Sequence, residues 1–231
     1  MKRPVRVLLE VGSKRVFASA VDWPGWSRSG RGEGDALLAL AAYGPRYATA
    51  LAGSGLGFVA PGEADDLQVV ERRAGNSGTD FGVPTLGPAG DELPVDDAEL
   101  DRLVRILRAG WVTFDGAAAR ATGITLRTGR RGGGRSLAKI VAHVFESERA
   151  YLGQLGGRSG RPTPDAPVAD AWARLRADIL EALDARAQGR PLTYPSRVRT
   201  PWSTRSFVRR VVWHLLDHAW EIEDRADLAV P

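Results

Sequence analysis

The second part of the chain carries the feature that most constrains its fold: four stretches in which apolar residues recur every three or four positions. The first stretch places them at Leu100, Leu103, Val104, Leu107, Trp111, Phe114 and Ala118. Similar stripes run through residues 137–155, 168–188 and 204–222. Apolar residues at this spacing lie on one side of an α-helix, and that side must be buried against another element. We therefore predict an all-α four-helix bundle over residues 94–231.

The starts of these helices carry residues that can cap them. Asp96 or Asp97 precedes the first stripe, Ser136 precedes the second, and Ser203 or Thr204 precedes the fourth. Side-chain oxygens of these residue types accept hydrogen bonds from the free N–H groups of a first helical turn. The caps therefore indicate where these helices begin.

The N-terminal part follows an alternating pattern instead. Apolar residues occupy every second position from Val5 to Val11, and the alternation resumes after a Gly-Ser turn. This pattern predicts a β-hairpin, whereas residues 34–51 have helical spacing and residues 67–72 form a further strand candidate. We therefore predict a small α+β module over residues 1–75.

The two parts are joined by residues 76–93, which are rich in Gly, Pro, Ser and Asp. Such a composition is typical of loops, because it supplies turn residues and few apolar side chains to bury. The predicted organisation is a module over 1–75, a linker over 76–93 and the helical bundle over 94–231.

Composition narrows the classes of protein that the chain can represent. It contains 32 basic and 28 acidic residues, most of them interspersed, so we do not expect a nucleic-acid partner. It contains no Cys, which excludes disulfides and thiolate ligands and is compatible with the cytoplasm. The N-terminal residues lack the apolar core of a signal peptide, and no apolar run reaches the ~20 residues of a membrane span. We expect a cytoplasmic protein that has no membrane segment.

The three histidines of the chain all lie on predicted helices. His214 and His218 are four residues apart, so their side chains project from one face of the last helix, and His143 lies at the edge of the apolar face of the second helix. A single histidine on such a face is more often an ordinary core residue than a ligand. Three on facing helices indicate a metal site, because buried imidazoles that remain neutral can share a cation.

These residues also carry a resemblance to a known family. Residues 142–152, AHVFESERAYL, and residues 200–221, TPWSTRSFVRRVVWHLLDHAWE, resemble the DinB-like (DinB/YfiT) superfamily. The resemblance covers roughly residues 93–224 and implies a four-helix bundle that binds a divalent ion, often zinc or nickel, through three histidines. It also implies a possible thiol-dependent transferase or isomerase using a low-molecular-weight thiol such as mycothiol or bacillithiol. Many members of the family have no established activity.

A weaker resemblance concerns the N-terminal module. Residues 18–30, ASAVDWPGWSRSG, and the predicted helix after them are similar to HicB-like antitoxin domains. This similarity implies a short sheet and a helix, but no helix-turn-helix or partner toxin is recognisable beside it. We expect an accessory module that covers the metal pocket or supports a homodimer.

Two further residues of the last helix are candidates for the site. Glu221 lies within ~20° of His214 in projection, because helical residues advance by about 100° each, and it could support a ligand histidine or act as a general base. Arg210, four residues before His214, could hold the carboxylate of an anionic substrate. For Glu221, a solvent-facing acid near the helix end is the alternative interpretation, and for Arg210 it is a position outside the site.

Three functions are compatible with these features. The first is a metal-dependent transferase, possibly thiol-dependent, or a hydrolase that acts on a small molecule. The second is a metal-binding stress or detoxification scaffold without catalysis. The third is a HicB-like regulatory protein with a structural metal, which is disfavoured because the basic residues are dispersed and no DNA-reading element is visible.

Overall fold

The alternating apolar residues near the N-terminus form a sheet in the computed structural model, which describes residues 4–128, 134–160 and 167–227. Its strands are β1 (Val5–Val11), β2 (Val16–Ala20), β3 (Ser27–Gly30) and β4 (Leu67–Ala74). The strand order is β3-β2-β1-β4, with β1 antiparallel to β2 and parallel to β4. The predicted hairpin is therefore confirmed, and the last strand reaches the sheet through a crossover that contains helices.

The crossover corrects one prediction, because residues 34–51 form two helices and not one. α1 (Glu33–Ala42) ends next to Tyr43, and α2 (Gly44–Leu51) begins directly after it. Pro45 is the reason, since proline cannot donate the backbone hydrogen bond that a continuous helix needs but fits the first turn of a new one. α1 packs on β2 and β3, and there the indole of Trp26 donates a 3.0 Å hydrogen bond to the Leu40 carbonyl.

The predicted linker contains structure of its own and is bonded to the sheet. It includes α3 (Ser77–Phe81) and a 3-10 turn, η3 (Ala89–Glu92). The buried carboxylate of Glu10 on β1 accepts hydrogen bonds from the backbone N–H of Thr85 at 2.9 Å and of Leu86 at 3.1 Å. The Thr79 hydroxyl also donates to Glu10. One carboxylate thus holds this segment against the sheet.

The long helices occupy the stretches with helical spacing. They are α4 (Asp97–Arg120), α5 (Leu137–Leu155), α6 (Val168–Ala187) and α7 (Thr204–Ala226). Asp96 accepts a hydrogen bond from the Glu99 N–H at 2.8 Å and Ser203 accepts one from the Ser206 N–H at 3.1 Å, whereas Ser136 occupies the cap position without such a bond. A small sheet followed by a helical region is thus the observed fold class.

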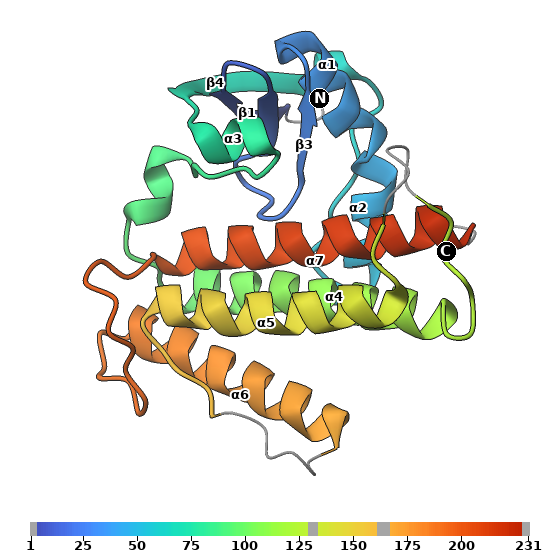
Figure 1. The fold of residues 1–231 in the computed structure, drawn as a ribbon. Coiled ribbons are helices and arrows are strands. Elements are labelled where there is room, and N and C mark those ends of the chain that lie inside the picture. The colour runs from blue at the N-terminus through green and yellow to red at the C-terminus, as the bar shows by residue number, and fades with distance from the viewer. Residues whose placement is uncertain (1–3, 129–133, 161–166, 228–231) are drawn as a thin grey trace.

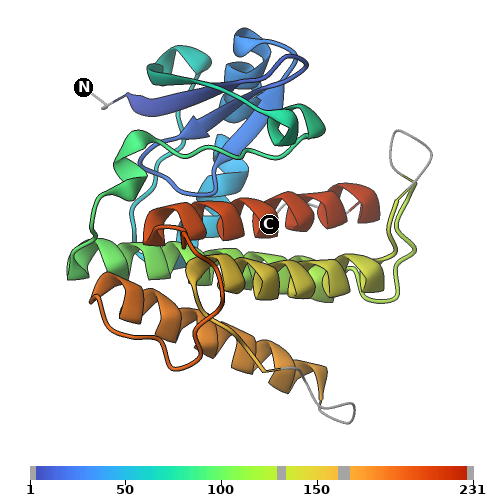
Figure 2. The ribbon, with the colours of Figure 1, turned by 60° about the vertical axis from the view of Figure 1, so that its left-hand side comes forward.

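α7 is the helix to which the other parts attach (Figure 1). It packs against α4 and α5 on one side and lies beneath the N-terminal sheet on the other (Figure 2). Phe17 of β2 meets Trp213 of α7 edge to face, with ring centroids 6.4 Å apart. At Gly25, whose φ is +90°, a Cβ atom would lie only 2.3 Å from the Val212 side chain. The turn therefore needs glycine for its left-handed backbone and for its close approach to α7.

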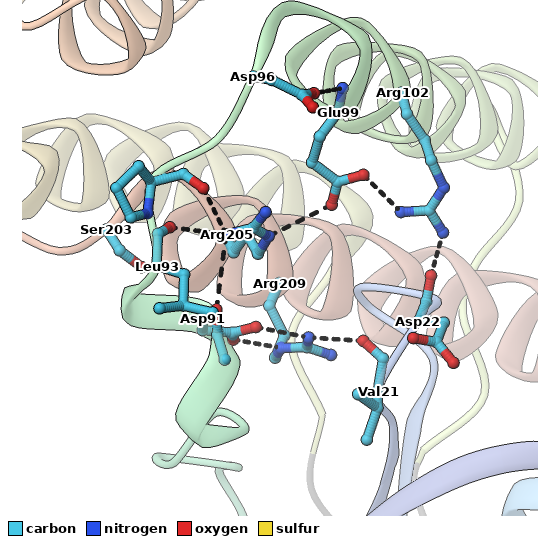
Figure 3. A network of polar contacts seen from close by, with 12 residues as sticks. Val21, Asp22, Asp91, Leu93, Asp96, Glu99, Arg102, Ser203, Arg205 and Arg209 are labelled. Atoms are coloured by element: carbon cyan, nitrogen blue, oxygen red, sulfur yellow. Dashed lines mark hydrogen bonds and ion pairs between the residues drawn. The ribbon is translucent and has the colours of Figure 1, made fainter.

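One arginine of α7 forms a buried polar link to the N-terminal part (Figure 3). Arg209 forms a forked ion pair with Asp91, with N–O distances of 2.8 and 3.0 Å, and its side chain is 11% exposed against 5% for Asp91. The same guanidinium donates to the carbonyls of Ala20 at 2.7 Å and Val21 at 2.9 Å. Arg209 therefore joins β2, the predicted linker and α7.

Neighbouring arginines extend this link toward α4 (Figure 3). Arg205 donates to the Leu93 carbonyl at 2.6 Å and pairs with Glu99 at 3.3 Å. Arg102 of α4 bonds the carbonyl of Asp22 in the turn after β2. A single apolar core also runs from the sheet to α6. In the described ranges, no helix combines the length and the apolar character that crossing a bilayer requires.

Candidate metal centre

The three histidines converge between α5 and α7. His143 faces α7, and His214 and His218 stand one turn apart on the facing side of α7, with ring centroids between 4.6 and 5.1 Å apart. One nitrogen from each ring lies within 4.8 Å of the others. His214 and His218 are buried and His143 is half-buried, so the cluster is more open on the α5 side.

The spacing of the nitrogens suits a shared cation. Nε2 of His143 and Nε2 of His214 are 3.2 Å apart. Two nitrogens that each bind one tetrahedral ion at ~2.0–2.1 Å lie about 3.3 Å apart. A donor set of imidazoles without carboxylates suits zinc, nickel or another borderline metal better than magnesium or calcium.

The electrostatics of the cluster favour neutral imidazoles. Burial, followed by the nearby His218 and His143, lowers the pKa of His214 to about 2. Burial, followed by the Arg135 and His218 charges, also lowers the pKa of His143. Both rings therefore keep a nitrogen lone pair at neutral pH, which is the form that binds a metal.

Glu221 is placed directly behind a histidine of the cluster. Its Oε2 accepts a 2.8 Å hydrogen bond from Nδ1 of His218, and its Oε1 accepts a 2.7 Å bond from Arg225. A proton held on Nδ1 leaves the lone pair of the His218 ring on Nε2, toward the other histidines. Nδ1 of His214, by contrast, is buried and has no hydrogen-bond partner among the described residues.

Arg210 lies beside the cluster, at a cavity of about 270 Å³ between α7 and the N-terminal part. Its guanidinium is 5.8 Å from the ring centroids of both Trp202 and Trp213. Burial lowers its pKa, and within the described ranges it makes neither a hydrogen bond nor an ion pair. The buried hydroxyls of Ser19 and Ser27 line the same cavity. Arg210, four residues before His214, therefore presents unused donors to a polar hollow.

Tyr151 lies in the apolar stripe predicted over residues 137–155, and the sequence reasoning did not single it out as a residue near the site. Its ring lies 5.6 Å from that of His214 and 5.7 Å from that of Trp202. Burial raises the pKa of its hydroxyl, with Arg210 acting in the opposite direction. The available signal was its position eight residues after His143, which places a residue with a polar tip on the same side of α5.

Three other acids that are close to the histidines in sequence contact other groups. Glu146 pairs with Arg149 at 2.6 Å, and the buried Glu148 accepts a 2.9 Å hydrogen bond from the Trp111 indole. Asp217 pairs with Arg28 of β3 at 2.9 Å. Glu221 is therefore the acid that touches a histidine of the cluster within the described part of the chain.

Comparison with known proteins adds a family to this geometry. A sequence model of the DinB superfamily matches residues 106–222, which span α5, α6 and most of α4 and α7 and include all three histidines. Searches of curated proteins and of solved structures found no match.

Proposed function

The chain belongs to the DinB superfamily, and from this premise we propose that it binds one divalent metal ion through His143, His214 and His218. The family is often metal-binding, and the convergence of one nitrogen from each imidazole within 4.8 Å is the observation that carries the proposal. We propose further that α4 to α7 constitute the four-helix bundle of this family, and that the ion is zinc or nickel.

The proposed activity is a metal-dependent transfer, with a low-molecular-weight thiol as cosubstrate, or a metal-dependent hydrolysis, in either case on a small molecule. Bound there, such an ion would act as a Lewis acid that activates a water or a thiol. Glu221 holds a proton on Nδ1 of His218 and so orients that ring. This assignment favours an orienting role over that of a general base, because Arg225 already occupies the other carboxylate oxygen.

Arg210 is the proposed contact for an anionic group of the substrate. Its guanidinium has unused donors and lies one helical turn from His214, at the cavity that Ser19 and Ser27 also line. A carboxylate held there would form charge-assisted hydrogen bonds, which are stronger than neutral ones. The rings of Trp202 and Trp213 each lie 5.8 Å from the guanidinium, within the range of cation–π attraction.

A non-catalytic metal-binding protein is the second candidate. It is favoured by the state of the acids, since in the described ranges Glu221 is bonded to two partners and Glu146 and Glu148 contact other groups. A catalytic reaction would then depend on a base supplied by the substrate or the cosubstrate.

Metal analysis of the purified chain tests the first step of the proposal. After metal removal and incubation with Zn²⁺ or Ni²⁺, the wild type is expected to retain about one ion per chain. His218→Ala is expected to lose most of it, whereas Glu146→Gln, which changes an acid on the solvent side of α5, is expected to retain it. Equal retention by His218→Ala, or none by the wild type, would contradict the metal site.

Thermal unfolding in the presence of small thiols separates the two candidate functions. A ligand that binds the folded chain raises its melting temperature. Stabilisation by a thiol that requires the metal supports the transferase, and its loss in Arg210→Gln when an anionic thiol is used supports the assigned substrate contact. A metal-loaded chain that no thiol stabilises points to the non-catalytic protein.

A further inference from the structure

A second cavity lies away from the histidines, between α2 with the 3-10 turn after it, η1 (Ala52–Ser54), and α4. Its volume is about 610 Å³, within the size range of small-molecule sites. Trp220 and Glu223 of α7 line it. Trp220 is two residues from His218, about 200° around the helix, so the cavity lies on the opposite side of α7 from the metal centre.

Small residues on both walls leave this space open. Ala50 and Gly53 line one wall, and Ala109 and Gly116 line the other. A Cβ atom at Gly53 would meet nothing within 4 Å, and one at Gly116 would lie 3.2 Å from the Arg120 guanidinium. Glycine inside a helix costs about 0.5–1 kcal/mol relative to alanine. Gly116 therefore lowers the stability of α4, at a position where the Arg120 guanidinium lies close to the helix backbone.

The charges along the cavity are unevenly satisfied. Arg46 and Arg120 at one end share the buried carboxylate of Glu223, at 2.7 and 2.6 Å. At the other end, Arg105 pairs with Asp101 at 2.7 Å. The arginines at the first end therefore share a buried acid, whereas the end around Arg105 can accept a further negative charge.

Arg108 and the Nε atom of Arg105 supply that capacity. Arg108 is exposed at the rim of the cavity and makes no hydrogen bond or ion pair with any residue that the structure describes. The Nε atom of Arg105 is buried and likewise lacks an acceptor among the described residues. A buried donor without an acceptor is costly, and the Nε atom of Arg105 lies one helical turn from the unpaired guanidinium of Arg108, so this end of the cavity can accept an anion.

We propose that this cavity binds a small organic anion that has one carboxylate and an apolar body. The carboxylate lies between Arg105 and Arg108, and the apolar body extends along Ala109 and Val112 toward Trp220. Val112, which is 72% exposed, gives the body an apolar wall at the rim. The guanidinium of Arg108, which has no ion pair among the described residues, matches one negative charge. The distance along α4 from Arg108 to Arg120 is about 18 Å at 1.5 Å per residue, which sets the length available to the ligand. This site is independent of the metal centre.

Calorimetric titration of the full, metal-loaded chain with octanoate tests the proposal. We expect saturable 1:1 binding that Arg108→Gln weakens about tenfold or more, because hydrogen bonds to charged groups contribute about 1.5–3 kcal/mol each. Gly53→Leu should also weaken binding, because the leucine side chain would fill part of the cavity. The backbone at Gly53 has room for a side chain. Arg174→Gln, which removes an exposed arginine of α6, is the matched control and should leave binding unchanged. The metal content of every variant should equal that of the wild type.

Two other ligands test the two halves of the predicted chemistry. 1-Octanol and inorganic phosphate should bind much more weakly than octanoate, since each lacks one of the required parts. Equal binding of either one, absence of octanoate binding, or an equal effect of Arg108→Gln and Arg174→Gln would overturn the proposal. A dimer that Val112→Glu dissociates would also overturn it, by showing that a second copy of the chain covers the cavity.

Discussion

The two polar sides of α7 differ in whether their charged groups have partners. On the side toward the sheet, Arg209 is paired with Asp91 and Asp217 with Arg28. Toward α5, Nδ1 of His214 is buried and has no hydrogen-bond partner among the described residues. Arg210, at the cavity between α7 and the N-terminal part, makes no hydrogen bond or ion pair within them. Folding alone accounts for the satisfied groups. The open donors of Arg210 fit the anionic substrate group that we propose, whereas the proposed metal would bind Nε2 of His214 and leave its Nδ1 unpaired.

The largest expected effect comes from breaking the satisfied side. Arg209→Ala leaves the carboxylate of Asp91, 4% exposed, without its forked partner. Removal of one member of a buried ion pair costs about 3–5 kcal/mol, so the free energy of unfolding in urea should fall by that amount. Arg6→Ala is the control, because the Arg6–Asp22 pair is about half exposed on both sides and such pairs contribute ~1 kcal/mol or less.

The double variant Arg209→Ala/Asp91→Ala sharpens this result. If the loss arises from the stranded carboxylate, the double variant should be more stable than Arg209→Ala alone. Equal stability of Arg209→Ala and Arg6→Ala would show that the sheet is held on α7 by apolar contacts and not by this network.

The buried acid Glu148, inside the helical region, should make the stability of the fold depend on pH. Burial raises the pKa of Glu148 to about 7, and one of its carboxylate oxygens has no partner in the described part of the chain. The folded chain therefore binds this proton more tightly than the unfolded chain does. The contribution is fully present below about pH 4.5 and is lost as the pH rises through about 7.

Glu148→Gln should remove this pH dependence. Urea unfolding at pH 8 should show the variant more stable than the wild type by up to about 3 kcal/mol, because one pKa unit corresponds to ~1.4 kcal/mol. At pH 4.5 the two should be nearly equal, since the glutamine oxygen can still accept the Trp111 bond. Glu146→Gln, at an exposed acid on the same helix, should show no such difference between the two pH values.

The sequence was sufficient to predict features that depend on helix periodicity. The positions of His214 and His218, and the direction of Glu221, follow from the angle between successive residues of one helix. The facing position of His143 required only that the apolar sides of two helices meet. The coarse fold class, strands followed by long helices, follows from the change of apolar spacing along the chain.

Features that depend on how separate elements meet could not be predicted in this way. The Arg209–Asp91 pair joins residues 118 positions apart, and it forms because the sheet lies on one particular side of α7. Tyr151 was not singled out because it lies within the apolar stripe of its helix, although its hydroxyl lies near Arg210 in the fold. The division of residues 34–51 into two helices at Pro45, by contrast, could have been predicted from the chemistry of proline, and it was missed.

The smallest expected effect concerns the carboxylate that touches the metal centre. Glu221→Gln keeps the size of the side chain but weakens the acceptor that holds the proton on Nδ1 of His218. Loss of such a partner lowers metal affinity by about 10–100-fold, and the conservative amide should lie at the lower end of that range. Competition with a zinc-binding dye measures the change.

Asp217→Asn is the matched control for this prediction, because Asp217 adjoins His218 in sequence but pairs with Arg28 on the sheet side of α7. It should leave zinc affinity unchanged while Glu221→Gln weakens it. Equal losses in the two variants would mean that the net negative charge near α7, and not the hydrogen bond to His218, sets the affinity. In that case the two polar sides of α7 would not be functionally separate.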